Sequence, residues 1–386
     1  MAPRRPDKKS KKQKGALSRA AAGSDSKPVA PQVLVKAAEF QLQEGNIQDA
    51  AALAQKALEQ AATDSDDQLL ALNFLGQINL ELGDFEAARA HFLQAVEIDG
   101  DGSKDEAVGG GPEKFLCLAQ LSEEGGRDSV GWFERGATAL KALIAVREER
   151  NSGSRRKSED AEAAIVLDEL KKKLAMTLCS VAEVYMTDLS WEEDAEQRCE
   201  ALVTEATLVA PDFAETWQTL ANVRISQERV DDAKAALTRS LELWKDLPPE
   251  DPSVPDFPSR VALARLLMEV GMEQEAIEVL ERLVGEDDQS VEVWYLGGWG
   301  LYVMGEKQKA ANASEEDWKA LWISSRVWLN QCQHLYALQD YEDERLGEHA
   351  KELLSLIAKE LGEAPAGEED DDDEWEDEDS DAEMKD

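Results

Sequence analysis

Several features that would mark an enzyme or a metalloprotein are missing from this sequence of 386 residues. It has no glycine-rich loop suited to phosphate, because Gly109-Gly110-Gly111 precedes a proline and follows no strand-like run. The three histidines fall in separate helical segments without the spacing of metal ligands. Acidic residues are so numerous that pairs of them carry no information about catalysis. We therefore expect no catalytic residue, no metal site and no cofactor.

Long apolar runs are also missing. No stretch approaches the roughly 20 apolar residues of a membrane span, and the first residues lack the apolar region of about 7–15 residues found in signal peptides. Only four cysteines occur, far apart and each within a helical apolar pattern, which favours buried packing over disulfides or metal binding. These absences predict an intracellular protein without a membrane partner.

The sequence is rich in acidic residues, and its formal net charge is −40. Residues 4–14 form a basic head with seven basic side chains and one acid, whereas residues 368–383 contain thirteen acids. About −33 therefore belongs to the remainder of the chain. Because phosphate binding needs positive grooves, direct nucleic-acid binding is disfavoured, and a basic protein is the complementary partner.

Both ends of the chain are predicted to be disordered. Residues 1–30 are rich in Lys, Arg, Ser and Pro, and their KKSKKQK run fits a nuclear-import signal, with an import receptor as partner. The alternative is a solvated basic tail without a function. Residues 362–386 form an acidic tail in which Trp375 is either a docking aromatic or idle.

The stretch of residues 212–244 carries the clearest repeat signal. With Trp217 as position four of a 34-residue unit, Ala221 falls at position eight, and Ala233 and Ser240 fall at positions twenty and twenty-seven. Small residues at these places let two helix axes approach to about 8–10 Å. This is the tetratricopeptide pattern, a helix–turn–helix unit. Because one unit cannot bury its apolar stripe alone, the pattern predicts neighbouring copies.

Weaker copies of the pattern extend over residues 31–361. They predict an all-α fold, a tetratricopeptide solenoid of about seven helix pairs, with residues 320–338 and 342–361 as C-terminal capping helices. Three interruptions are expected as loops. Residues 101–112 read as flexible, residues 150–159 as a charged mobile insertion, and residues 247–258, with five prolines, as a stiff linker, an elaborated loop or a hinge.

In such a superhelix the first helix of each unit lines the concave face. At its inward positions this sequence mixes acids, amides and a late aromatic cluster, which predicts a groove for an extended basic segment with apolar anchors. The alternative is that the acids merely solvate an exposed face. The residues that we predict to contact a client are Glu81, Glu183, Glu215, Gln218, Asn222, Glu269, Glu292, Tyr295, Trp299 and Tyr302.

Two further segments, TDLSWEEDAEQRCEALVTEA (residues 187–206) and LANVRISQERVDDA (residues 220–233), carry a family resemblance. Together with the basic head and the acidic tail, they make nearly the whole chain similar to the fungal dedicated assembly chaperones of large-subunit ribosomal protein L-four. The resemblance implies that the protein captures newly made L-four, embraces its long internal loop and escorts it to nuclear pre-ribosomes. It thus implies cytoplasmic and nuclear localisation.

Two other functions stay open at this point. A general tetratricopeptide scaffold or an acidic histone-type chaperone would share the same fold and charge. A heat-shock cochaperone is disfavoured, because clamps for acidic heat-shock C-termini use Lys, Asn and Arg at inner positions. Here Glu81 and Glu269 occupy position thirteen.

Overall fold

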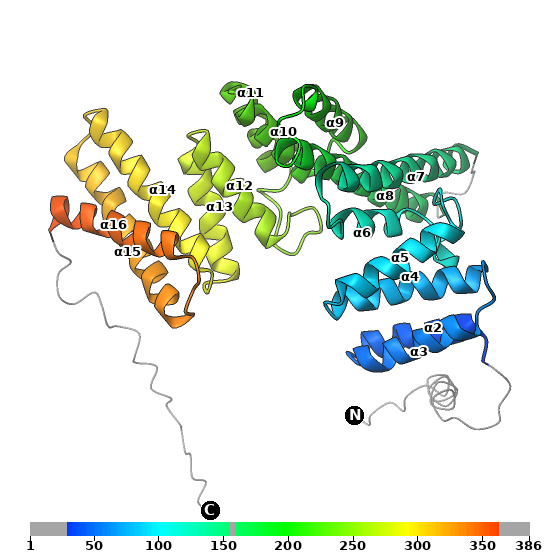
Figure 1. The fold of residues 1–386 in the computed structure, drawn as a ribbon. Coiled ribbons are helices and arrows are strands. Elements are labelled where there is room, and N and C mark those ends of the chain that lie inside the picture. Colours follow the sequence, from blue (N-terminus) through cyan, green and yellow to red (C-terminus); the bar gives the residue numbers. More distant parts are fainter. Residues whose placement is uncertain (1–28, 154–158, 363–386) are drawn as a thin grey trace, which may run out of the picture. The chain divides into compact units, whose positions relative to one another are not determined.

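The computed structural model describes residues 29–153 and 159–362 (Figure 1). These residues form fifteen α-helices and one 3-10 helix, and no strand occurs among them. The expected all-α tetratricopeptide fold is confirmed. The KKSKKQK run, the acidic run after residue 362 and Trp375 lie outside the described residues.

The described helices group into two compact units, which are divided between residues 227 and 228. In the first unit each helix packs against the next in antiparallel fashion, as Figure 1 shows for the blue and cyan pairs. Its helices are α2 (Pro31–Gln43), α3 (Ile47–Gln60), α4 (Asp66–Glu81), α5 (Phe85–Ile98), α6 (Glu113–Gln120), α7 (Gly126–Gly153), α8 (Glu159–Met186), α9 (Ala195–Val209) and α10 (Ala214–Ser226), with the 3-10 helix η1 at Glu106–Val108.

The second unit continues the same alternation of first and second helices. It comprises α11 (Val230–Glu242), α12 (Phe257–Glu269), α13 (Glu273–Glu286), α14 (Val291–Ala310), α15 (Glu315–Leu338) and α16 (Glu344–Leu361). Helix α15 packs along α14 as the second helix of the seventh pair, so α16 alone follows the last pair. The sequence had suggested two capping helices there.

Glycines at position eight explain how closely the paired helices approach. A Cβ atom on Gly76 of α4 would lie 2.6 Å from the ring of Phe92 on α5. On α14, a Cβ on Gly298 would lie 2.6 Å from the side chain of Leu329 on α15. Such distances are below van der Waals contact, so only glycine permits these helix pairs to pack at this separation.

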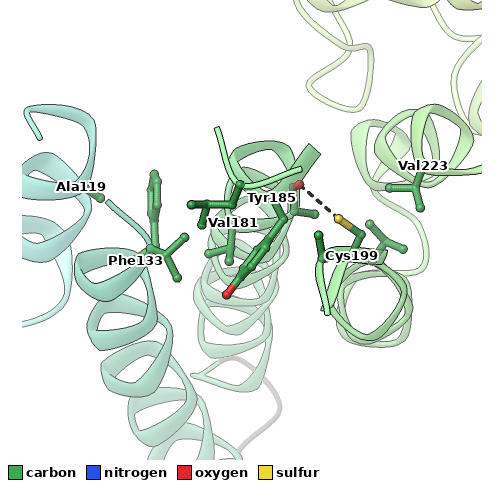
Figure 2. Close-up of a cluster of buried hydrophobic side chains, with 11 residues drawn as sticks. Ala119, Phe133, Val181, Tyr185, Cys199 and Val223 are labelled. Carbon is green, nitrogen blue, oxygen red and sulfur yellow. Dashed lines mark hydrogen bonds between the residues drawn. The ribbon is translucent and has the colours of Figure 1, made fainter. Parts of the chain in front are cut away.

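The apolar stripes of successive repeats meet in continuous cores. Figure 2 shows one in the first unit, where side chains of α6 to α10 interdigitate around Phe133, Val181 and Tyr185. Cys199 is buried there, and its Sγ lies 3.5 Å from the carbonyl oxygen of Ala182. Burial raises the pKa of this thiol, which keeps it protonated and unreactive. The packing role expected for the cysteines holds here.

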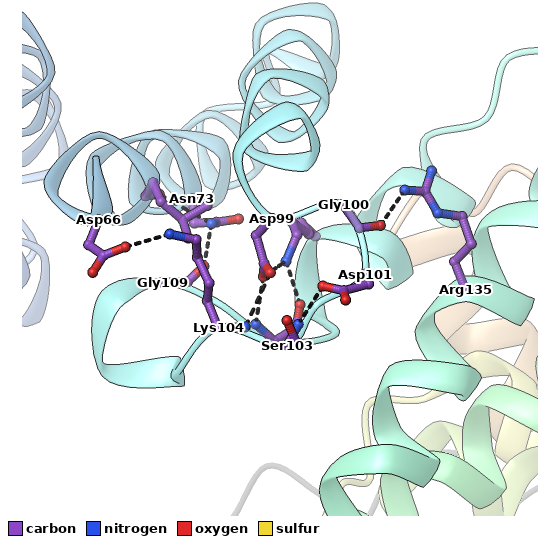
Figure 3. Close-up of polar contacts among 12 residues, drawn as sticks. Asp66, Asn73, Asp99, Gly100, Asp101, Ser103, Lys104, Gly109 and Arg135 are labelled. Atoms are coloured by element: carbon purple, nitrogen blue, oxygen red, sulfur yellow. Dashed lines mark hydrogen bonds and ion pairs between the residues drawn. The ribbon is translucent and has the colours of Figure 1, made fainter. Parts of the chain in front are cut away.

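The segment 101–112 differs from the flexible loop that we expected (Figure 3). Asp99 and Lys114, both almost fully buried, form an ion pair of 2.6 Å at its base. Nζ of Lys104 lies 2.7 Å from Asp66, and the side-chain amide of Asn73 donates to the carbonyl oxygen of Gly109 at 2.5 Å. These bonds hold the segment, including η1, against α4, because buried backbone groups require partners. We call residues 99–112 the strap.

The other two interruptions are shorter than expected. Helix α7 continues to Gly153 and α8 already begins at Glu159, so part of the segment 150–159 is helical. In the proline-rich stretch, α12 begins at Phe257, with Pro258 in its first turn, where the missing N–H costs nothing. The boundary between the two compact units falls near residue 227, not at these prolines.

Helices α12 and α13 are tied by a charged pair whose removal should be measurable. The guanidinium of Arg260, only 4% exposed, donates to both carboxylate oxygens of Glu286 at 2.6 Å. This contact lowers the pKa of Glu286. Glu286→Gln should lower the free energy of unfolding by about 1–2 kcal/mol, less than for a fully buried pair because Glu286 is partly exposed.

The effect should depend on pH in a defined direction. Because the pKa of Glu286 is lower in the folded state than its ordinary value of 4.5, its stabilising contribution is present above that value and is lost as the pH falls through the folded-state pKa. Urea unfolding of the two proteins at a series of pH values measures this. Equal differences at pH 7 and at pH 3 would show that the ion pair contributes nothing.

Candidate functional site

The predicted client-contact residues of the first unit lie on α4, α8 and α10. Glu81 is exposed at the last residue of α4, and Glu183 is exposed on α8. On α10, Glu215 and Asn222 are half-buried. Gln218 is only 7% exposed, so most of its side chain is unavailable to a partner.

Glu183 on α8 and Glu215 on α10 belong to successive repeats. Both carboxylates act on the Cys179 thiol, whose pKa rises to about 12, mainly through burial. Partial burial also raises the pKa of Glu183, although its side chain remains accessible. A carboxylate that has lost part of its water interacts more strongly with an incoming cation. The first helices α8 and α10 each present one acid, of which Glu183 is exposed and Glu215 is half-buried.

On α4, nearer the N-terminus, the strap covers part of the first-helix surface that a partner would otherwise contact. Asn73 occupies an inward position of α4, yet its side-chain amide is bonded to Gly109 of the strap and to the carbonyl oxygen of Leu69. A partner approaching this part of α4 would contact the strap rather than Asn73. Sequence spacing could not show that residues 36 positions later in the chain cover Asn73.

In the second unit, three of the predicted residues line one hollow of about 690 Å³. Glu269 comes from α12, and Tyr295 and Trp299 come from α14. The hollow is otherwise formed by residues that the sequence did not single out, which are Arg265, Met268, Glu273, Leu296, Val303, Asp343, Arg345, Leu346 and His349. We call this the first-helix hollow, because α12, α14 and α16 supply all but two of its residues.

An aromatic group forms one wall of the first-helix hollow. A hydrogen bond of 2.7 Å joins the hydroxyl of Tyr295 to Nδ1 of His349. The His349 ring stands edge-on to Trp299 at 5.6 Å and to Tyr295 at 5.8 Å. Because the three side chains fix each other's orientation, this wall is preorganised for apolar contact or for a cation above a ring face. No spacing links residue 349 to residue 295, so sequence reasoning missed it.

The charges at the first-helix hollow are of both signs, and several are already paired. Glu292 forms an ion pair with Arg265, and Glu273 accepts from Nζ of Lys307 at 2.6 Å. Among the described residues no ion pair engages the carboxylate of Glu269, which is exposed. Glu269 is therefore available to a cation, whereas Glu292, which we expected to be equally available, is not.

Tyr302 belongs to a different environment. Its ring stacks on Trp322 of α15 at 5.3 Å with an interplanar angle of 7°, and its carbonyl oxygen accepts from the Trp322 indole at 3.1 Å. It does not line the first-helix hollow. The predicted aromatic cluster thus divides into Tyr295 and Trp299 at the hollow and Tyr302 in the α14–α15 packing.

Two other kinds of site, a metal site and a membrane span, are absent from the described part of the chain. In residues 29–153 and 159–362, no cluster of three or more His, Cys, Asp or Glu could hold a metal ion. Among the same residues, no helix is both long enough and apolar enough to span a membrane.

Comparison with known proteins gives a consistent set of relatives. Residues 30–101 match the model of the tetratricopeptide repeat family. The "Probable assembly chaperone of rpl4" of Emericella nidulans is 51% identical over 86% of this chain and 82% of its own length. The protein of the same name from Schizosaccharomyces pombe is 34% identical over 81% of this chain and 87% of its own length.

A solved structure shows the same relationship. The protein called "Assembly Chaperone of RpL4 (Acl4) (Residues 1-338)" is 56% identical to this chain. The match covers 74% of this chain and 100% of that one, with a TM-score of 0.69. This likeness extends over most of the helices described above.

Proposed function

This chain belongs to the family of assembly chaperones of rpl4, and we propose that it captures newly made ribosomal protein L-four before that protein joins the ribosome. The observation that carries the proposal is the 51% identity to a relative of that name over 86% of the chain. The properties of the first helices support it independently, because they fit a basic polypeptide.

Charge is the first of these properties. Glu81, Glu183 and Glu269 are exposed on first helices, and none takes part in an ion pair within residues 29–153 and 159–362. The chain as a whole carries −40. Such a surface accelerates encounter with a basic segment, and its free carboxylates form charge-assisted hydrogen bonds with Lys or Arg. An acidic groove of this kind substitutes for the phosphates that the client meets later in ribosomal RNA.

Apolar anchoring is the second property. Charged contacts at a surface contribute little affinity, whereas aromatic side chains in preformed hollows supply most of it. The first-helix hollow offers Trp299, Tyr295 and Met268 beside the free carboxylate of Glu269. A segment that alternates basic and apolar side chains can pair with the carboxylate and contact the aromatic wall at the same time. We propose that the internal loop of L-four is this segment.

The proposal includes the route that the client takes. The basic run KKSKKQK at residues 8–14 fits an import signal, so the pair would form in the cytoplasm and enter the nucleus with an import receptor. Shielding the basic loop during transit prevents indiscriminate binding to RNA, since unshielded Lys and Arg bind phosphates without sequence preference.

Affinity measurements with purified proteins test the proposal against its rivals. The full chain should bind L-four at least about 100-fold more tightly than it binds core histones of similar charge, because the hollow and the charges act together. A peptide ending in an acidic heat-shock C-terminus should not bind. Equal affinity for L-four and histones at the same salt concentration would support the acidic histone-type chaperone instead.

A further inference from the structure

A second hollow lies elsewhere on the second unit, between α11 and α13. Its volume is about 340 Å³, half that of the first-helix hollow. It is lined by the last turns of α11, the turn that follows it and one face of α13. We call it the second-helix hollow, because all of its residues except Met272, which directly precedes α13, lie on second helices or in this turn. It shares no residue with the first-helix hollow.

The floor of the second-helix hollow is held rigidly. Trp244 is 2% exposed, and the guanidinium of Arg282 lies over its ring at 5.3 Å. Arg282 also donates to the carbonyl oxygens of Lys245 and Leu247, at 3.1 and 2.8 Å. Its hydrogen-bond donors are thus engaged with the turn after α11. A site whose floor is fixed in this way loses little entropy when it binds a ligand.

One buried group in this floor lacks the partner that it needs. The indole N–H of Trp244 is inaccessible to solvent and has no hydrogen-bond acceptor among the described residues. A buried indole N–H normally finds an acceptor, and leaving one unpaired is unfavourable because the group has lost its bonds to water. Because Trp244 lines the hollow, a ligand that brings a carbonyl oxygen to this N–H would remove that cost.

Acidic side chains surround this floor, and two of them are free. Glu242 lies 3.8 Å from Arg239, and Glu278 accepts from Gln274 at 3.4 Å. In contrast, the carboxylates of Asp246 and Glu275 have no hydrogen-bond or ion-pair partner within the part of the chain that the structure describes. Two cations also line the hollow, Lys245 and the already engaged Arg282. The acids there are Glu242, Asp246, Glu275 and Glu278, so the charge at the hollow is predominantly negative.

We propose that the second-helix hollow binds a short basic peptide segment of a partner protein. Lys or Arg side chains of the segment pair with Asp246 and Glu275, and an apolar side chain contacts Leu241 and Val279. A backbone carbonyl of the segment accepts from the Trp244 indole. Access to this N–H requires movement at the rim, where Met272 is long and flexible. The site is independent of client capture on the first helices.

An NMR spectrum of the tryptophan indole N–H groups of the full chain tests this proposal. The chain has ten tryptophans, and the signal of Trp244 is assigned with the variant Trp244→Phe. The probe is the synthetic peptide acetyl-GKLRKG-amide, with acetyl-GELEEG-amide as its charge-reversed counterpart. The basic peptide should shift the Trp244 indole N–H signal in a saturable way, and the acidic peptide should not. A Trp244 signal that stays in place at saturating basic peptide overturns the proposal.

Matched variants separate this hollow from general attraction to an acidic protein. The double variant Asp246→Asn/Glu275→Gln should raise the Kd obtained from the Trp244 shift about tenfold, since two ion pairs are lost. The double variant Asp231→Asn/Glu281→Gln removes the same charge from α11 and α13 outside the hollow, and should leave this Kd unchanged. Equal Kd values in both double variants would also overturn the proposal. Both double variants should bind L-four as tightly as the wild-type protein does, because neither of them changes a first helix.

Discussion

Replacing Glu183 and Glu269 together by lysine is expected to weaken binding of L-four about 100-fold, or about 2.7 kcal/mol. Both side chains are exposed on first helices, α8 and α12, and each reversal turns attraction for a basic segment into repulsion. Partial burial already raises the pKa of Glu183, so a cation there interacts at a lower effective dielectric than at an open surface. The change is measured as a Kd at fixed ionic strength.

The choice of these two acids follows from the contacts seen in the structure. Glu292 is less informative, because Glu292→Lys would place two cations side by side at Arg265 and disturb the local fold. Glu97→Lys with Glu281→Lys is the matched control, since both are exposed acids on second helices. If the control double variant weakens binding as much as the test variant, net charge rather than the first-helix face governs capture.

Salt separates steering from anchoring in the same experiment. Raising the ionic strength from 0.1 to 1 M shortens the Debye length from about 10 to about 3 Å. The affinity difference between the wild-type protein and the lysine variant should therefore shrink. The affinity that remains at high salt is assigned to apolar contacts such as those offered by Trp299 and Tyr295. Trp299→Leu should reduce this remaining part.

The second large effect is expected from Lys114→Ala, which should lower the free energy of unfolding by about 3–5 kcal/mol. Nζ of Lys114 lies 2.6 Å from both a carboxylate oxygen of Asp99 and the carbonyl oxygen of Gly111. Burial lowers the pKa of Lys114 although Asp99 acts to raise it, which means that desolvation outweighs the attraction of the pair. Removing one partner leaves the other charge buried and unpaired, and this carries most of the cost.

The measurement combines urea unfolding with hydrogen exchange in the strap. The amides of Lys104 and Gly111 donate to the Asp99 carboxylate, so both should lose protection in Lys114→Ala. Lys104→Ala is the matched control. Its ion pair with Asp66 is solvent-exposed, and its loss should cost much less than the loss of the buried pair. Equal losses for the two alanine variants would mean that the buried pair does not organise the strap.

Much of the fold could be predicted because its determinants are local. The spacing of Trp217, Ala221 and Ala233 specifies two helices and their separation within one repeat. Gly76 and Gly298 fall at position eight of their repeats, and the structure supplies the reason for a small residue there, since a Cβ atom would collide with the facing helix. The strap was misjudged because its glycines suggested flexibility, while the bonds that pin it reach residues 66, 73 and 114.

The residues of the candidate site also fall into those that local spacing predicts and those that depend on contacts between distant parts of the chain. Helical periodicity placed Glu269, Tyr295 and Trp299 on inward positions, and the structure brings these three to one hollow. It could not distinguish the free Glu269 from Glu292, because the partner of Glu292 lies on another helix. His349 was passed over for the same reason, since its contacts with residues 295 and 299 exist only after the last helix has packed.

The amino-acid order alone thus determined the repeat architecture, the acidic first-helix surface and the kind of partner that this surface favours. These properties depend on periodicity and composition, which short stretches of chain carry by themselves. The tertiary structure alone decided which carboxylates are free, where the hollows lie and how the strap is held. Those properties depend on pairs of side chains far apart in the chain, whose proximity no local spacing encodes.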